Sequence, residues 1–278
     1  MKRNGTSSIL SYIVLTITAL IHVAPVVYMC VSSFKPDARV LADGSSWLAF
    51  VPVGASFANF SDVFELVNFT RALFNSVFIT TMIVGCGLVV NSLCGYALAR
   101  LDWRGKNMAL ALVLSLLVIP FETIAVPLFY QLSVLGWRNS YHVQIVPFIA
   151  DAFSIFLFYS FFISMPKELE EAARIDGAGP WRIFFMIIVP NAKPVFATVA
   201  ILTFLMRWGN YLWPLMVTIG ETYRPLTVAM AAFENQVKQW GDIMAFGVLM
   251  VLPVLVVFLL FQRWFVQGVA ASGTGRKD

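Results

Sequence analysis

Three ionisable side chains stand inside apolar stretches of this sequence, where they could form ion pairs or bind a polar solute. They are Glu122, Asp151 and Arg207, and the neutral amides Asn91 and Asn210 share such surroundings. A charged group within a bilayer is costly and usually faces a helix-bundle interior or a water-filled cavity. Two interpretations stay open: Asp151 pairs structurally with Arg207, or either of them faces a transported solute.

The segment that follows Arg207 mixes aromatic and amide side chains. Aromatic faces stack on the C–H surfaces of sugars, and an Asn amide offers both a donor and an acceptor to hydroxyl groups. The alternative is an interfacial belt, because Trp and Tyr gather near lipid headgroups. Trp213 and Pro214 fit the belt better. The candidate residues of a solute pathway are Trp208, Asn210, Tyr211, Glu122, Asp151 and Arg207.

Residues 166–190 have the chemistry of a docking surface for another protein. Good helix formers fill 167–176, and three early glutamates lie where the helix dipole stabilises negative charge. Gly177 can end this helix, and Pro180 can begin a second one. The second helix, over 181–189, is strongly apolar and is expected to pack against other helices. The pattern predicts a short helix–turn–helix.

The exposed part of the first helix combines small residues with charged ones. Small side chains permit a partner to approach closely, and charges at the rim set its register. A solvated loop that merely joins two spans is the alternative, but such a loop seldom needs two helices and a sharp break. The candidate docking residues are Glu171, Ala172, Ala173, Arg174, Asp176 and Gly177.

Composition places these residues in a membrane protein. The chain has 278 residues, of which 59% are hydrophobic and 12% charged, and its mean hydropathy is +0.81. Soluble chains are about a quarter charged, and a membrane span needs about 20 mostly apolar residues. We predict an all-α polytopic membrane protein of one domain. Its six transmembrane helices cover about 10–32, 74–98, 108–130, 142–163, 194–216 and 243–265.

Lysine and arginine residues indicate the orientation of these spans. With the N-terminus inside, the inner segments hold twice as many of them as the outer segments. Both termini are therefore predicted to be cytoplasmic, and residues 166–190 then form an inner loop between spans four and five. The outer segment from Phe34 to Arg71 is the longest loop and is rich in turn residues, so we expect short interfacial pieces there.

Other kinds of chemistry have no support in the sequence. The three cysteines lie in apolar stretches without a CxxC motif and the two histidines are far apart, so neither disulfides nor a metal site is expected. Signatures of hydrolases and metalloenzymes are missing, which argues against an enzyme. Without a GxxxxGK[ST] motif, the chain cannot bind ATP through a P-loop. A net charge of +4 without a basic block argues against nucleic acid and leaves membrane lipid as the expected surrounding.

Several motifs together resemble one protein family. Glu171-Ala172-Ala173-x-x-Asp176-Gly177-Ala178 is similar to the EAA loop in the permease subunits of bacterial binding-protein-dependent ABC importers. Further motifs resemble the carbohydrate branch, and the maltose-type second permease subunit most closely. These motifs are Asn75-Ser76, Tyr96-Ala97-Leu98-Ala99-Arg100, and the segments 208–214 and 262–268. Gly209 departs from the pattern, because relatives often have Asn there.

The resemblance implies a mechanism and a set of partners. Residues 166–190 would form a coupling helix in a groove of a separate ATPase, and closure of two ATPase subunits around ATP would drive alternating access. ATP and Mg would be bound by that ATPase, and this chain would hold no cofactor. A second six-span permease subunit and an extracytoplasmic solute-binding protein would complete an importer of a sugar or sugar-like solute. It would lie in the cytoplasmic (inner) membrane of a bacterium.

Two other function classes remain as alternatives. A self-sufficient secondary transporter or channel would predict inverted repeats and ion ligands near the middle of the bilayer, and neither is visible in the sequence. A membrane enzyme would need clustered catalytic groups at one membrane depth. Co-purification of an ATPase and a second permease would discriminate the importer from both.

Overall fold

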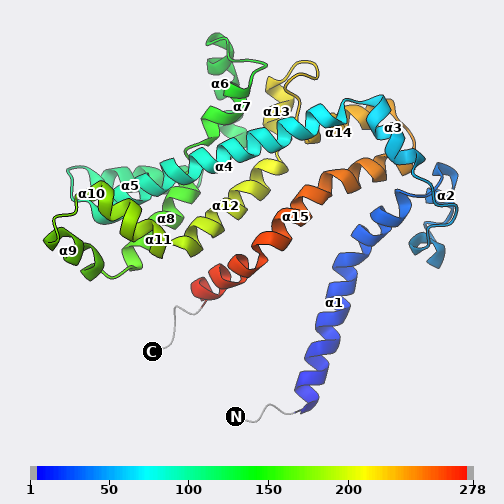
Figure 1. The fold of residues 1–278 in the computed structure, drawn as a ribbon. Coiled ribbons are helices and arrows are strands. Elements are labelled where there is room, and N and C mark those ends of the chain that lie inside the picture. Colours follow the sequence, from blue (N-terminus) through cyan, green and yellow to red (C-terminus); the bar gives the residue numbers. More distant parts are fainter. Residues whose placement is uncertain (1–4, 274–278) are drawn as a thin grey trace. The chain divides into compact units, whose positions relative to one another are not determined.

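The chain is built from helices. The computed structural model describes the backbone of residues 5–273 and the side chains of residues 11–261, and no strand occurs among the described residues (Figure 1). Four helical segments are long and apolar enough to cross a membrane, or up to six if each of two bent helix pairs counts as one span. This agrees with the predicted all-α polytopic class. The chain divides into two compact units.

The first unit comprises the described residues up to Thr70 together with Ala229–Pro253. Its long helix α1 (Gly5–Ser32) is followed by short pieces in the segment where short pieces are expected. These are α2 (Asp37–Ala42), the 3₁₀ turn η1 (Trp47–Phe50) and α3 (Ala58–Leu66). That they lie at a membrane interface stays a prediction.

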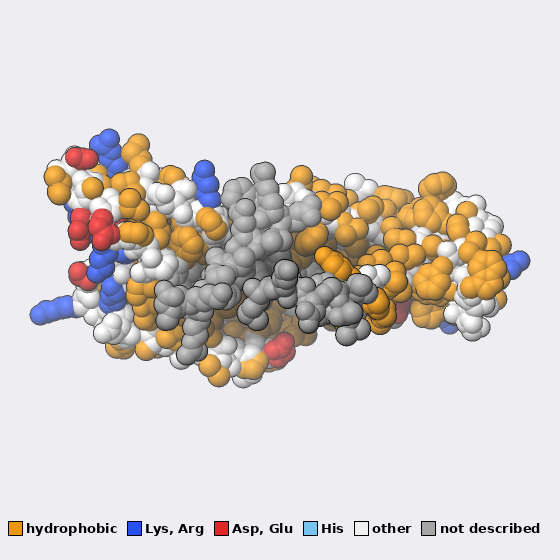
Figure 2. Space-filling model, turned by 90° about the horizontal axis from the view of Figure 1, so that it is seen from below, with side chains coloured by type: hydrophobic (Ala, Val, Ile, Leu, Met, Phe, Trp, Pro, Cys, Tyr) orange, Lys and Arg blue, Asp and Glu red, His pale blue; other side chains and the backbone are white. Residues whose placement is uncertain are grey.

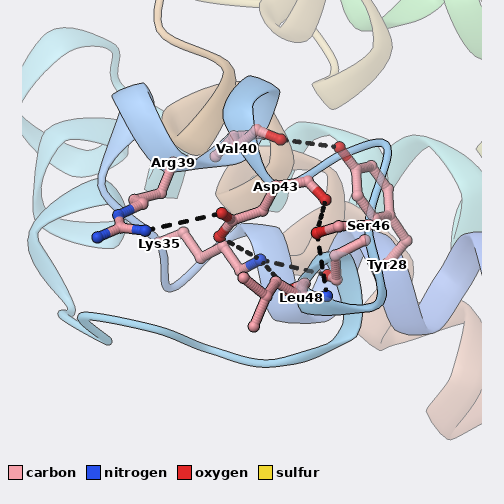
Figure 3. Close-up of polar contacts among 8 residues, drawn as sticks. Tyr28, Lys35, Arg39, Val40, Asp43, Ser46 and Leu48 are labelled. Carbon is pink, nitrogen blue, oxygen red and sulfur yellow. Dashed lines mark hydrogen bonds and ion pairs between the residues drawn. The ribbon is translucent and has the colours of Figure 1, made fainter.

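A buried cation organises the turn after α1. The Nζ atom of Lys35 lies 3.3 Å from Oδ2 of Asp43 and donates hydrogen bonds to the carbonyl oxygens of Leu48 (2.6 Å) and Ala49 (3.4 Å) (Figure 3). Only 1% of the Lys35 side chain and 5% of the Asp43 side chain are exposed. Arg39 approaches the same carboxylate at 3.8 Å from an exposed position. We refer to these five residues as the Lys35 cluster.

The same unit contains the beginning of α15 (Trp240–Gly273). The backbone N–H groups of Trp240 and Gly241 donate to Oδ1 of Asp37, which satisfies donors that a helix N-terminus leaves free. A Cβ atom on Gly241 would lie 2.6 Å from Nδ2 of Asn59, so the close approach requires a glycine. Asn59 in turn donates to the carbonyl of Lys35 (2.9 Å).

The second unit comprises Arg71–Val228 and the described residues from Val254 onward. Its longest element is α4 (Phe69–Arg100), which is continuous and contains no proline. One face of α4 carries Gly87, Asn91 and Gly95 at helical spacing and packs on the neighbouring span. A Cβ atom on Gly95 would lie 2.6 Å from Cβ of Phe158, so glycine permits the two helices to meet closely.

The neighbouring span, predicted as one helix over 142–163, is interrupted just before Asp151. The chain forms α7 (Tyr141–Ile145), the 3₁₀ turn η2 (Val146–Phe148) and then α8 (Ala152–Ser164). Asp151 is the N-cap of α8, and its Oδ2 accepts the N–H and the hydroxyl of Ser154 (2.8 and 2.7 Å). Asn91 bridges the interruption, because it donates to the carbonyl of Ile149 (3.0 Å) and accepts the N–H of Asp151 (2.9 Å).

Two pairs of helices meet at a sharp bend; the first bend falls within the predicted span 108–130, and the second lies just before the predicted span 194–216. Helices α5 (Lys106–Leu116) and α6 (Phe121–Val134) meet at 103°, at a break that ends with Pro120. The segment 180–191 meets α12 (Lys193–Trp208) at 78°. It consists of α10 (Pro180–Ile183), the π-helical turn η3 (Phe184–Ile188) and α11 (Val189–Asn191). Within this unit α12 packs beside α8 (Figure 1). Two short helices follow, α13 (Leu212–Val217) and α14 (Leu226–Gln236).

Candidate functional site

The predicted docking helix is α9 (Glu168–Ile175), and a glycine ends it. The N–H of Ala178 donates to the carbonyl of Ala173 (2.9 Å), and the N–H of Gly177 donates to that of Arg174 (3.0 Å). This pair of hydrogen bonds defines a Schellman cap, whose left-handed residue is Gly177 with φ +79°. The predicted helix, break and second helix are confirmed, and the second helix begins at Pro180.

Most of the predicted docking residues lie on the surface. Ala173 is buried, whereas Glu171, Ala172, Arg174, Asp176 and Gly177 are exposed. Ile175 is 86% exposed, an unusual position for a large apolar side chain on a charged helix. In the space-filling view, acidic and basic side chains gather at the end of the second unit where α9 lies (Figure 2). The outward face of α9 thus presents small, apolar and charged groups together.

The opposite face of α9 is attached to α4 by Glu170, one of the three early glutamates of the helix. Glu170 is 4% exposed, and its Oε1 lies 3.1 Å from Nε of Arg100. Tyr96 donates its hydroxyl to Oε2 of the same carboxylate (3.4 Å), and Arg174 approaches Oε2 at 3.7 Å. The guanidinium of Arg100 also donates to the carbonyl of Met165. We refer to Tyr96, Arg100, Glu170 and Arg174 as the Glu170 cluster.

The second helix packs on the same part of the unit, as expected. Ile183, Phe184 and Ile188 are buried with Phe158 and Phe162 in one apolar cluster that also contains Tyr96 and Ala173. The π-helical turn spans Phe184 to Ile188, and Trp181 and Phe185 stack on the exposed side. The apolar cluster therefore seats the whole loop on α4 and α8.

A small polar pocket lies within the second unit, between α4, α7 and the end of α12. Three of the predicted pathway residues, Arg207, Trp208 and Asn210, line it. Other polar side chains in the lining are those of Ser76, Thr80 and Gln144, and Trp213 adds a second indole ring. Apolar residues such as Ile79 and Phe148 complete the wall. We refer to this hollow as the polar pocket.

The polar pocket contains an unused donor and an unused acceptor. Nε of Arg207 and Oε1 of Gln144 are buried, and neither makes a hydrogen bond with the described residues. Gln144 is held in place because its amide nitrogen donates to the carbonyl of Tyr223 (2.9 Å). Buried polar groups without partners are costly, so this arrangement favours a polar occupant such as water or a solute hydroxyl.

The two charged residues of the predicted structural pair have different partners. Among the described residues, no direct ion pair joins Asp151 and Arg207, and the Asp151 carboxylate caps α8. The guanidinium of Arg207 lies 4.3 Å from the ring centroid of Phe148, in cation–π geometry. Glu122 and Tyr211 are exposed and do not line the polar pocket.

Trp213 corrects the interpretation of its segment as an interfacial belt. The side chain is 1% exposed and donates its indole N–H to the carbonyl of Val143 (2.9 Å). It packs edge-on against Phe121 and Phe148. Trp213 is therefore a buried residue that lines the polar pocket. A buried Trp and an interfacial Trp cannot be distinguished by sequence when the helix boundaries are unknown.

Asparagines and hydroxyls hold the loop above the polar pocket. Asn75 donates to the carbonyls of Thr222 (3.1 Å) and Arg224 (2.9 Å) and accepts the hydroxyl of Tyr141 (2.7 Å). Ser76 accepts the N–H of Leu226 at 2.8 Å. The Asn75-Ser76 motif therefore positions the loop that connects α13 to α14.

Comparisons with known proteins identify relatives along the whole chain. Residues 87–271 match the family described as "Binding-protein-dependent transport system inner membrane component". An arabinooligosaccharides transport system permease protein of Halalkalibacterium halodurans is 37% identical over 98% of this chain and 99% of its own length. A diacetylchitobiose uptake system permease protein of Streptomyces coelicolor is 34% identical over 96% of this chain and 88% of its own length.

A solved structure has the same fold. It is a chain of a bacterial ABC transporter involved in the import of the acidic polysaccharide alginate. The match has a TM-score of 0.82 at 24% identity and covers 95% of this chain and 98% of that one. At this level of identity the similarity demonstrates the fold alone.

Proposed function

The chain belongs to the family of binding-protein-dependent transport system inner membrane components, and on this premise we propose how it works as the permease subunit of an ATP-driven sugar importer. Both termini are cytoplasmic, and α9 is the coupling helix that docks on a separate ATPase. A second six-span permease subunit, two ATPase subunits that bind ATP and Mg, and an extracytoplasmic solute-binding protein complete the importer. It moves its solute across the cytoplasmic membrane of a bacterium by alternating access.

One observation supports the coupling role most directly. α9 buries Glu170 and Ala173 on one face and leaves Glu171, Ala172 and Ile175 exposed on the other. A loop with no partner would have little reason to expose Ile175 on a helix whose opposite face is firmly attached. The relatives are transport permeases rather than enzymes, and the family is binding-protein dependent. A self-sufficient secondary transporter is therefore not favoured.

The polar pocket supports a share in solute contact. Arg207 and Gln144 provide an unused donor and acceptor, and Trp208 and Asn210 add an aromatic face and an amide. Such a set suits hydroxyl-rich solutes. The relatives are named for arabinooligosaccharides and diacetylchitobiose, so we propose an oligosaccharide as the solute.

Affinity purification of the tagged chain in mild detergent is the first test. We expect an ATPase and a second permease to be recovered with it. A homogeneous chain that catalyses uptake alone in liposomes would contradict the proposal and favour a secondary transporter.

Two variants test the coupling surface in the assembled complex. Gly177→Pro should distort the Schellman turn, and Glu171→Lys should reverse a docking charge. Both should separate ATP hydrolysis from uptake while the protein stays in the membrane. Asp102→Lys is a matched charge reversal on another fully exposed side chain, and it should leave uptake unchanged. Normal uptake by both α9 variants at normal expression would contradict the assignment.

A further inference from the structure

The Glu170 cluster joins two elements that are far apart along the chain. Tyr96 and Arg100 lie at the end of α4, and Tyr96 is separated from Glu170 by 74 residues. The side chains of Arg100 and Glu170 are 4% and 5% exposed. Arg100 also holds the carbonyl of Met165, just before α9 begins. α9 is thus attached to the end of α4 at two points: the carboxylate of Glu170 within the helix, and the carbonyl of Met165, which precedes the helix.

The other end of the same helix reaches the polar pocket. Ser76, Thr80 and Ile83 of α4 line it. No break interrupts α4 between these residues and Arg100. From Thr80 to Arg100 the helix spans about 30 Å at about 1.5 Å per residue. An unbroken helix keeps its i→i−4 hydrogen bonds along its whole length, so a displacement at Arg100 is transmitted along its axis more directly than through an interrupted segment.

The direct route along the chain is less rigid. Between α9 and the pocket residues at the end of α12, the chain contains the π-helical turn at Phe184–Ile188 and a bend of 78° before Lys193. Irregular helical turns of this kind interrupt the regular i→i−4 hydrogen bonds and often occur at hinges. The stiff connection between α9 and the polar pocket therefore runs through α4.

We propose that the Arg100–Glu170 ion pair is the positioning contact that makes α9 and α4 move together, so that movement of α9 reaches the polar pocket through α4. This inference rests on the proposed coupling role of α9. Separating a buried ion pair leaves two uncompensated charges, so the pair keeps α9 attached to α4 while force acts on α9. Tyr96 supports the same carboxylate.

The test measures the polar pocket directly and needs no identified solute. In a background without Cys30, Cys86 and Cys94, Thr80→Cys reports the polar pocket through its rate of reaction with a water-soluble maleimide. The complex with its co-purified ATPase is placed in liposomes, and labelling is compared before and after trapping with ATP, Mg and vanadate. We expect trapping to change the rate by at least about fivefold, the lower end of typical coupling between sites.

Variants of the cluster assign the effect to the ion pair. Arg100→Gln and Glu170→Gln should bring the ratio of the two labelling rates to about one, while the ATPase still co-purifies. Arg100→Lys keeps the charge and should restore most of the change. Asp102→Asn is the matched control, because it removes one charge from an ion pair with Lys106 that lies outside both the Glu170 cluster and the docking surface, and it should preserve the full change.

Tyr96→Phe keeps the test decisive if the charge variants fail to assemble. It removes one hydrogen bond to Glu170 and leaves the packed ring, so it should reduce the trapping effect partially. The inference would be overturned if Arg100→Gln kept the full change in labelling rate on trapping, or if Arg100→Lys did not restore it. Where the charge variants do not assemble, a full change in labelling rate in Tyr96→Phe would overturn it. If the unmodified chain recovers no ATPase, the proposed function itself fails, which is a separate result.

Discussion

The Lys35 cluster and the Glu170 cluster use the same chemistry over different distances along the chain. Each has a buried carboxylate, one buried cation and one exposed arginine four residues from the carboxylate. In the first unit, Lys35 and Asp43 are eight residues apart. In the second unit, the buried groups around Glu170 come from another helix, 74 residues away at Tyr96. One cluster closes a loop, and the other attaches one helix to another.

Because of this difference, we expect the Lys35 cluster to stabilise its own segment and the Glu170 cluster to couple the movements of two helices. A buried ion pair is costly to break, but its net contribution relative to an apolar contact is small. Lys35 also donates to the carbonyls of Leu48 and Ala49, so loss of the Lys35 cluster should destabilise residues 35–49. Loss of the Arg100–Glu170 pair should instead free α9 from α4, with little effect elsewhere in the second unit.

The largest expected effect on stability is that of Lys35→Met. The change leaves the Asp43 carboxylate buried without its cation, and it should destabilise residues 35–49 by about 3–5 kcal/mol. Thermal unfolding of the detergent-solubilised protein and amide hydrogen exchange over residues 35–49 measure the effect.

A double variant controls for the remaining charge. Lys35→Met with Asp43→Leu should recover part of the stability, because an apolar pair of similar volume often replaces a buried ion pair. If exchange over 35–49 is unchanged in Lys35→Met, the Lys35 cluster does not organise this segment.

Gly95→Val should affect the Glu170 cluster and spare the Lys35 cluster. The new side chain would collide with Phe158, whose Cβ would lie 2.6 Å from the added Cβ, and overpacking of this kind costs about 1–3 kcal/mol. Because α4 would shift against α8, we expect faster exchange in α9 and unchanged exchange over residues 35–49.

Gly85→Val is the matched control in the same helix. It changes helix propensity equally, but a Cβ on Gly85 meets no atom within 4 Å. Equal effects from both substitutions would mean that propensity, rather than the close approach of α4 and α8, decides the outcome.

The sequence predicted the outline of the docking loop because its signals are local. Helix formers, a glycine and a proline follow one another within 166–190, and the structure has α9, a left-handed Gly177 and a second helix in that order. The sequence could not predict that Glu170 is buried against α4. Its partners come from a distant segment, and Glu168, Glu170 and Glu171 look alike without the tertiary contacts.

The sequence also could not predict all the residues that line the polar pocket. Arg207, Trp208 and Asn210 share one pocket, as their proximity in sequence suggests, but Gln144 and Thr80 enter it from other helices. Asp151 and Arg207 form no direct ion pair among the described residues; the span containing Asp151 is interrupted, and its carboxylate caps α8. One signal was available: Pro147 stands four residues before Asp151, and a proline favours a break in a helix.

Asn91→Leu tests a long-range contact made by an uncharged side chain, for comparison with the Arg100–Glu170 ion pair. The substitution removes the partners of the Ile149 carbonyl and the Asp151 N–H, and it should cost about 1–3 kcal/mol through these buried unpaired groups. Thermal unfolding measures the loss. Asn235→Leu is the control, because Asn235 is exposed and bonds only within its own helix, to Ala231. A smaller loss in Asn91→Leu than in Asn235→Leu would contradict the bridging role.

The smallest expected effects concern the exposed arginines, Arg39 and Arg174. Their side chains are 55% and 57% exposed, and they approach the carboxylates at 3.8 and 3.7 Å. Exposed ion pairs at this spacing contribute less than about 0.5 kcal/mol, since water and salt screen them. Arg39→Gln and Arg174→Gln should therefore shift thermal unfolding very little, and similarly in both clusters. A clearly larger loss for Arg174→Gln would mean that the second cluster depends on its exposed arginine. The connection of α9 to α4 would then be weaker than the buried pair alone suggests.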